Sequence, residues 1–188
     1  FSFRMFKDLK SLNDQPFTNW FTAGLWFNMI ASLGTFTLAF MMASHNFNQN
    51  IHLASLYFYL HFQYNGFFTF ACIGLLLANI PIQELQQKNN NTTFWLFFYS
   101  CIPAYFLSVL WAKIPVWLFV IVILAAFTQM FAWLRLLKNL WRVILTNPTF
   151  GKIGRNLLII VGMAITAKFV LQLGSTIPSV SKLAFGFR

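Results

Sequence analysis

The chain has 188 residues, of which 59% are hydrophobic and only 9% are charged. A soluble globular domain carries about 25% charged residues, disordered chains are polar, and a disulfide scaffold needs more cysteines than Cys72 and Cys101. The composition therefore predicts an integral membrane protein. Its formal net charge of +10 would suggest nucleic-acid binding in a soluble protein, but the basic residues form no soluble basic domain, so we expect no nucleic-acid partner.

Five stretches are long and apolar enough to cross a bilayer, whose hydrocarbon core takes roughly 20 helical residues. In chain order they are residues 21–44, 53–80, 93–112, 116–134 and 157–174. The second is longer than a perpendicular crossing needs, so we expect it to tilt or to extend beyond the hydrocarbon. The third and fourth are joined by a very short segment ending at Pro115, which predicts a tight antiparallel hairpin. The predicted fold is an all-α bundle forming one polytopic transmembrane domain.

The basic segment 135–156 separates the last two stretches. Arg135, Lys138 and Arg142 recur in it at helical spacing among apolar residues. One interpretation is an interfacial helix attracted to anionic lipid. The favoured one is that the fourth helix continues past the bilayer, with basic side chains that snorkel and fix the topology.

The distribution of Lys and Arg predicts the orientation of the chain. Nine basic residues fall on one side of the predicted spans, namely Arg4, Lys7, Lys10, Lys88, Arg135, Lys138, Arg142, Lys152 and Arg155, and three on the other, namely Lys113, Lys182 and Arg188. Because positive charge is retained in the cytoplasm, we expect a cytoplasmic N-terminus, in a bacterial inner membrane. The chain opens on Phe1 rather than Met, and we expect it to belong to a longer protein or to associate with other membrane subunits.

Polar side chains concentrate on the second stretch. Tyr57, His61, Tyr64, Asn65 and Phe68 follow α-helical spacing and are predicted to form one stripe facing the bundle interior. Gly66 and Gly74 would let another helix or a flat ligand approach closely.

His61 is the histidine that lies well inside a predicted span, whereas His45 and His52 are expected near the external membrane surface. A neutral imidazole there could ligate a heme iron or another metal, with Tyr64 or Asn65 as supporting partners. The alternative is a histidine that hydrogen-bonds between helices, and the sequence leaves both open.

Lys168 places an ammonium inside the fifth stretch, with no acidic residue in any span to pair with it. Burying that charge alone would cost several kcal/mol by order of magnitude. It could balance an anion such as a heme propionate or transfer protons, or it could snorkel toward the membrane surface.

Other polar residues in the spans are expected to form interhelical hydrogen bonds; they are Asn28, Ser32, Thr35, Thr128 and Gln129. The sequence contains no phosphate-binding Gly-rich loop, no HExxH or GxSxG motif and no paired intramembrane carboxylates. These absences weaken an ATPase, a zinc protease and a carboxylate-driven pump, while an enzymatic activity stays undecided.

The run from Tyr59 to Phe70 resembles a helix of polytopic heme-binding membrane proteins related to subunit I of the heme-copper oxidases. The closing residues 184–188 are similar to multi-span proteins of Bacteroidetes-type bacteria. This resemblance implies that His61 is an axial heme ligand in a respiratory or electron-transfer protein. The chain has no further intramembrane histidines for a second heme and a copper, so the resemblance does not imply oxygen reduction.

The leading hypothesis is therefore a heme-associated membrane component with His61 as iron ligand, supported by Tyr64 and Asn65, and with Lys168 as an electrostatic partner. The alternatives are a transporter or channel component with a polar intramembrane pathway, and a non-catalytic assembly subunit of a membrane complex.

Overall fold

The computed structural model describes residues 4, 5, 7, 9, 15–45, 47–81, 87–111, 114–146 and 150–177. Five of its helices are long and apolar enough to cross a membrane. They are Thr18–Ala43, Gln49–Ala78, Asn90–Val109, Val116–Thr146 and Lys152–Gly174. The described residues contain no strand, and the predicted all-α fold with five spans is confirmed. The chain is therefore an integral membrane protein by the length and composition of its helices.

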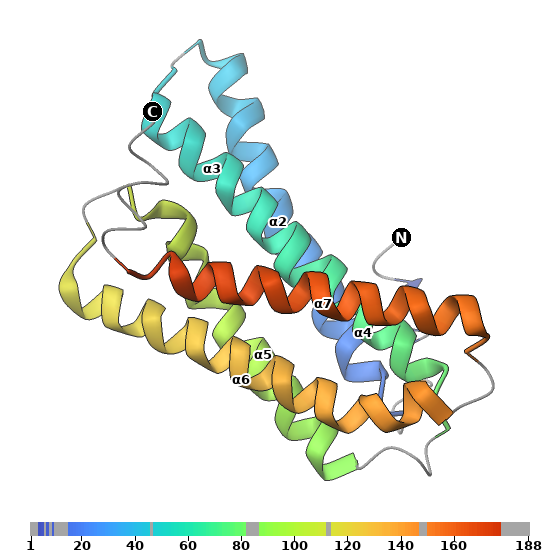
Figure 1. The fold of residues 1–188 in the computed structure, drawn as a ribbon. Helices are drawn as coiled ribbons and strands as arrows, with labels where there is room; N and C mark the ends of the chain where they lie inside the picture. Colours follow the sequence, from blue (N-terminus) through green and yellow to red (C-terminus); the bar gives the residue numbers. More distant parts are fainter. Residues whose placement is uncertain are drawn as a thin grey trace. The chain divides into compact units, whose positions relative to one another are not determined.

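The chain divides into two compact units, residues 1–78 and 79–188, which we describe separately. In the first unit, α2 (Thr18–Ala43) packs against a second, composite span made of α3 (Gln49–His61), η1 (Phe62–Phe68) and α4 (Thr69–Ala78). Figure 1 shows α2 lying alongside α3 and α4. The Asn48 side chain begins α3 by accepting hydrogen bonds from the amides of Asn50 and Ile51.

Small residues let the two spans of the first unit approach closely. A Cβ at Gly24 would lie 3.4 Å from the Phe67 carbonyl oxygen, and one at Gly34 would lie 2.7 Å from the Ser55 carbonyl oxygen. These two contacts show that the spans are antiparallel. Around them Trp20, Phe27 and Phe70 are fully buried and their rings touch, with the Phe27 and Phe70 centroids 5.1 Å apart. This aromatic core holds the first unit together.

The middle of the second span is a π-helix, η1, rather than a continuous α-helix. The Tyr64 carbonyl accepts hydrogen bonds from both the backbone amide and the hydroxyl of Thr69, the latter at 2.8 Å. A π-helix inserts an extra residue into the helical turn. It therefore rotates the side chains that follow His61 away from the positions that α-helical spacing predicts.

The second unit contains α5 (Gln87–Ala104), η3 (Tyr105–Val109), α6 (Val116–Thr146) and α7 (Lys152–Gly174). Pro103 lies at the end of α5, just before the helix tightens into the 3-10 turn η3. The Pro115 carbonyl accepts from the Phe119 amide at 3.1 Å, so this proline begins α6 as predicted. Contacts between α5 and α6 confirm the predicted hairpin.

The fourth helix continues well past the predicted end at residue 134. Its 31 residues correspond to about 46 Å of α-helix, longer than the hydrocarbon core, and they include Arg135 and Lys138. Segment 135–156 is thus helical up to Thr146, and where this part of α6 lies relative to the bilayer stays a prediction. Residues 82–86, 112–113, 147–149 and 178–188 lie outside the described residues, as do the predictions that concern Lys113, Lys182 and the closing segment 184–188.

Candidate functional site

Histidine 61 lies at the junction of α3 and η1 and is buried. Its Nδ1 lies 3.0 Å from Nδ2 of Asn65, one turn later. Its ring lies nearly perpendicular to the ring of Phe62, with the two centroids 5.2 Å apart. The imidazole is therefore fixed in orientation by a neighbouring amide and an aromatic ring, as the prediction of a supporting Asn65 requires.

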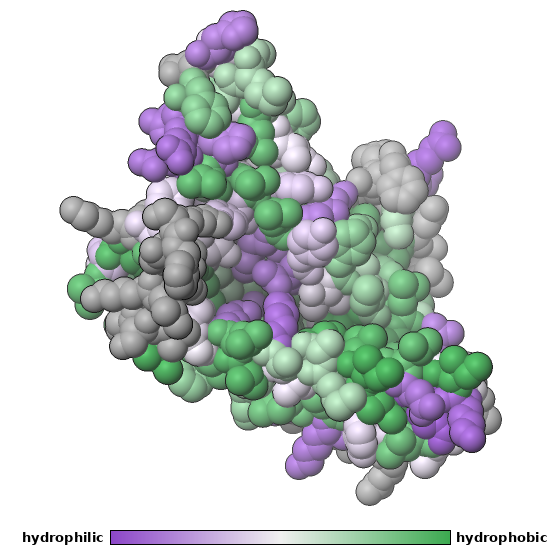
Figure 2. Space-filling view, turned by 45° about the horizontal axis from the view of Figure 1, so that its top comes forward, coloured by the Kyte–Doolittle hydropathy of each residue, from purple (hydrophilic) through white to green (hydrophobic). Residues whose placement is uncertain are grey.

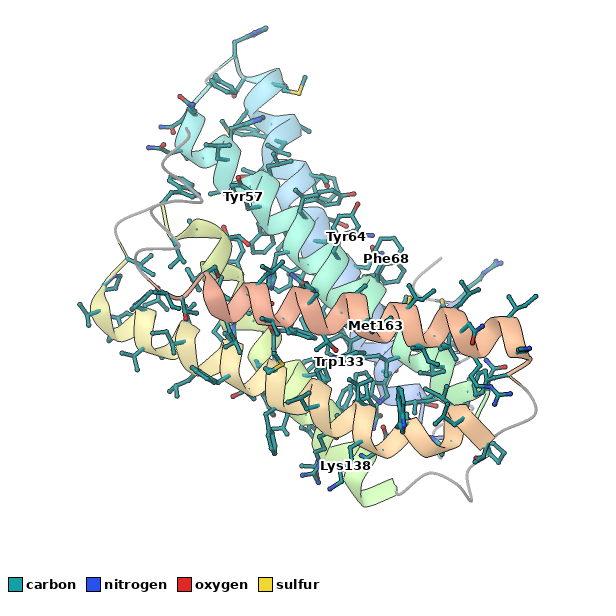
Figure 3. All side chains as sticks on the ribbon, in the orientation of Figure 1. Tyr57, Tyr64, Phe68, Trp133, Lys138 and Met163 are labelled. Atoms are coloured by element: carbon teal, nitrogen blue, oxygen red, sulfur yellow. The ribbon has the colours of Figure 1, made fainter. Side chains whose placement is uncertain are left out.

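Two members of the predicted stripe, Tyr64 and Phe68, do not face inward. Tyr64 is 61% exposed and stacks on the exposed Phe68, with ring centroids 5.7 Å apart. Figure 3 shows Tyr64 and Phe68 projecting together from the side of the span. The prediction of one stripe is wrong because η1 breaks the α-helical spacing: His61 and Asn65 stay inside while Tyr64 turns outward. Tyr64 therefore does not support His61.

Two features beside His61 bear on the binding of a heme, namely the contact with Asn65 and the packing at Gly66. The Asn65 side-chain amide lies 3.0 Å from Nδ1 of His61, and the tautomer of the ring decides which group donates. Iron ligation by Nε2 needs the tautomer with the proton on Nδ1, which would donate to the Asn65 side-chain oxygen. The close approach offered by Gly66 is already used, since a Cβ there would lie 2.6 Å from the Phe27 Cβ.

Gly74 is likewise covered, by the ring of Phe21 at 3.3 Å. Among the described residues no group of three His, Cys, Asp or Glu could hold a metal ion. The two glycines that were expected to admit a flat ligand are therefore covered by side chains of the first unit, and heme binding stays a prediction.

Lysine 168 lies on α7 with its ammonium 4.5 Å from the centroid of the Phe169 ring. Phe169 is buried and packs against Phe97 of α5, and the buried Cys101 thiol is within electrostatic range of the ammonium. The ammonium is thus turned toward the interior of the second unit, which argues against snorkelling. A cation–π contact offsets part of the cost of burying the charge.

His61 and Lys168 belong to different units. The predicted pairing of the two therefore stays a prediction.

Two hydrogen bonds join α6 and α7 inside the second unit. The Gln172 amide donates to the Gln129 side-chain oxygen at 2.6 Å, and the Trp133 indole donates to the Thr166 hydroxyl at 2.8 Å. The interhelical prediction is confirmed for Gln129.

The hydroxyls of Ser32, Thr35 and Thr128 instead donate to carbonyls of their own helices. For these three residues the interhelical prediction is wrong. A short hydroxyl that lies on a helix reaches the carbonyl one turn earlier more easily than a neighbouring helix.

One polar residue of the second span was not predicted as part of the candidate site. Gln63 is half-buried in the middle of the span, beside Tyr64. Neither its amide nor the Tyr64 hydroxyl has a hydrogen-bond partner among the described residues. Counting by α-helical spacing from Tyr57 passes over position 63, and only the presence of an amide inside an apolar run could have marked it.

Comparison with protein-family models, with curated proteins and with solved structures finds no match for this chain. The resemblance of residues 59–70 to heme-binding membrane proteins therefore stays a prediction. What the structure establishes is an integral membrane protein with five candidate spans.

Proposed function

We propose that this chain is a membrane-embedded component of a larger assembly, held to its partner through the polar face of η1. The observation that carries the proposal is the pair Gln63 and Tyr64. Both lie at the middle of the span Gln49–Ala78, and neither side chain has a hydrogen-bond partner in the described part of the chain. The function proposed is association, without a catalytic role for these residues.

Because they lie at the middle of a candidate span, Gln63 and Tyr64 are expected to lie in the hydrocarbon core of the bilayer. A polar group at the bilayer centre finds no water, so an amide or a phenol there is favourable only when another polar group bonds it. Asn28 lies at a similar depth, because Gly24 faces Phe67 and Gly34 faces Ser55. A partner that crosses the membrane here could bond polar groups of both spans.

A second exposed tyrosine lies at the middle of the third span. Tyr99 is 65% exposed and stacks on Trp95 with ring centroids 5.3 Å apart. Its hydroxyl also has no hydrogen-bond partner among the described residues. Tyr99 is thus a further candidate contact, in the second unit, of the same chemical kind as Tyr64.

The proposal is tested by the mass of the particle that contains this chain. The full protein, extracted from its native membrane in a mild detergent, is expected to have a mass larger than one chain by native mass spectrometry. The Gln63→Leu/Tyr64→Phe variant is expected to dissociate. The matched control is Thr35→Val, which removes an exposed hydroxyl that already bonds to Ser32 of its own helix. A single-chain mass for the unaltered protein, or equal dissociation of the control, would refute the proposal.

Heme ligation by His61 is the second candidate. It is favoured by the burial of the ring and by its contact with Asn65. Ligation of iron by Nε2 requires the ring tautomer with its proton on Nδ1. A transport pathway lined by polar residues would have to include residues of both units. No specific contact among the described residues favours such a pathway.

A further inference from the structure

The pairing of α6 with α7 fixes which parts of the two helices lie side by side. Gln129 bonds to Gln172, Trp133 bonds to Thr166, and the Arg155 guanidinium donates to the Leu145 carbonyl at 2.7 Å. The helices are therefore antiparallel. Residues 157–167 of α7 lie beside approximately residues 133–143 of α6.

These neighbouring segments differ in character. Leu157, Ile160 and Met163 of α7 are more than half exposed, whereas the adjacent part of α6 contains Arg135 and the exposed Lys138. In Figure 3, Met163 lies on α7, and Lys138 projects from the side of α6 that faces away from α7. Figure 2 shows hydrophilic and hydrophobic residues side by side at its lower right, where α7 begins. This end of the helix pair has a basic side and an apolar side.

If α6 and α7 crossed the bilayer upright, Arg135 and Lys138 of α6 would lie at the same depth as the exposed apolar residues of α7. Charged side chains would then lie in the hydrocarbon core. The conflict is removed when the end of the pair lies obliquely at the membrane surface, with Leu157, Ile160 and Met163 of α7 toward the acyl chains and the basic side of α6 and the first turn of α7 toward the headgroups. We propose that residues 135–146 of α6 and the first turns of α7 form an interfacial layer. It binds anionic phospholipid through Lys138 and Lys152.

The charges of the second unit support an external anion as the ligand. Its described part contains no Asp or Glu, and Lys138 and Lys152 are both exposed. These cations therefore have no carboxylate partner there. Trp141 is half exposed on the same stretch of α6, and tryptophan is enriched at the level of the headgroups. Lipid phosphate supplies the negative charge that the surface lacks.

The test measures lipid binding to the full purified protein. The protein is titrated with phosphatidylglycerol or with phosphatidylcholine, and the bound lipid is counted by native mass spectrometry. The variants are Lys138→Gln and Lys152→Gln, alone and together. Lys7→Gln is the matched control, because Lys7 is an exposed lysine of the first unit. Lys138→Arg keeps the charge and is expected to bind as the unaltered protein does.

We expect phosphatidylglycerol to be preferred, and each Lys→Gln change to weaken it about fivefold, while Lys7→Gln leaves it unchanged. Millimolar inorganic phosphate should not displace the lipid, since acyl chains contribute to its binding. Equal binding of both lipids, an equal loss with Lys7→Gln, or displacement by inorganic phosphate would each overturn the proposal. Unchanged helix content by circular dichroism shows that the variants fold.

Discussion

Single glycines determine how closely the two spans of the first unit can pack. At Gly34 the atoms that a Cβ would meet are the Ser55 carbonyl oxygen at 2.7 Å and the Tyr59 amide nitrogen at 2.9 Å. Both belong to the backbone, so no side-chain rotation can relieve the overlap. At Gly154 of α7, in contrast, nothing lies within 4 Å of an added Cβ. The same substitution should therefore have opposite effects at the two positions.

Gly34→Ala is expected to lower the free energy of unfolding by about 1–3 kcal/mol, the usual cost of overpacking a filled interior. Gly154→Ala is expected to raise it by up to about 1 kcal/mol, because alanine favours the helix more than glycine does. Unfolding of both variants in detergent micelles, followed by circular dichroism, measures the difference. Equal stability of the two would contradict the close contact at Gly34.

At the scale of elements, α6 and α7 are joined by side-chain hydrogen bonds within the apolar interior. The bond between Gln129 and Gln172 has each amide as the partner of the other. Removing one glutamine leaves the other amide without that partner in surroundings that offer no water, whereas removing both leaves no such polar group behind.

Gln129→Leu and Gln172→Leu are each expected to destabilise the protein by roughly 1 kcal/mol, and the double variant by less than the sum of the two. A double-mutant cycle on thermal unfolding in detergent gives the coupling. Strictly additive effects would show that the two amides do not interact. Thr128→Val serves as the control, since the Thr128 hydroxyl donates only to Leu124 of its own helix.

At the scale of the whole molecule, the five spans establish a membrane protein, and whether it binds a cofactor is a question for experiment. With Phe27 against Gly66 and the Asn65 amide directed at Nδ1, we expect His61 to be a structural residue of the first unit. Substitution of His61 should then lower the stability of the protein and leave its visible absorption spectrum unchanged.

Oxidised and reduced absorption spectra of the full protein, purified from heme-supplied cells, test this expectation. We expect no Soret band that depends on His61, and we expect His61→Ala to lower the unfolding temperature, because it removes one hydrogen-bond partner of Asn65 and opens a cavity beside Phe62. A Soret band lost on His61→Ala but kept in a variant such as Tyr64→Phe would establish heme ligation and overturn the structural role.

Much of the fold follows from hydropathy. The five spans were predicted close to their observed positions because a bilayer requires about 20 apolar residues per helix, whatever the helices pack against. The continuation of α6 beyond residue 134 was also favoured from the spacing of Arg135, Lys138 and Arg142. The candidate site was predicted less well: His61 and Asn65 do contact each other, but Tyr64 faces outward and Gln63 was not singled out.

The sequence by itself determined that this protein belongs in a membrane, how many helices can cross it and where its basic residues concentrate. Those properties depend on the composition of each segment alone. Only the tertiary structure decided which side of each helix is buried. The π-helix at Phe62–Phe68 and the contact of Phe27 with Gly66 result from packing between spans, and local spacing contains no information about that packing.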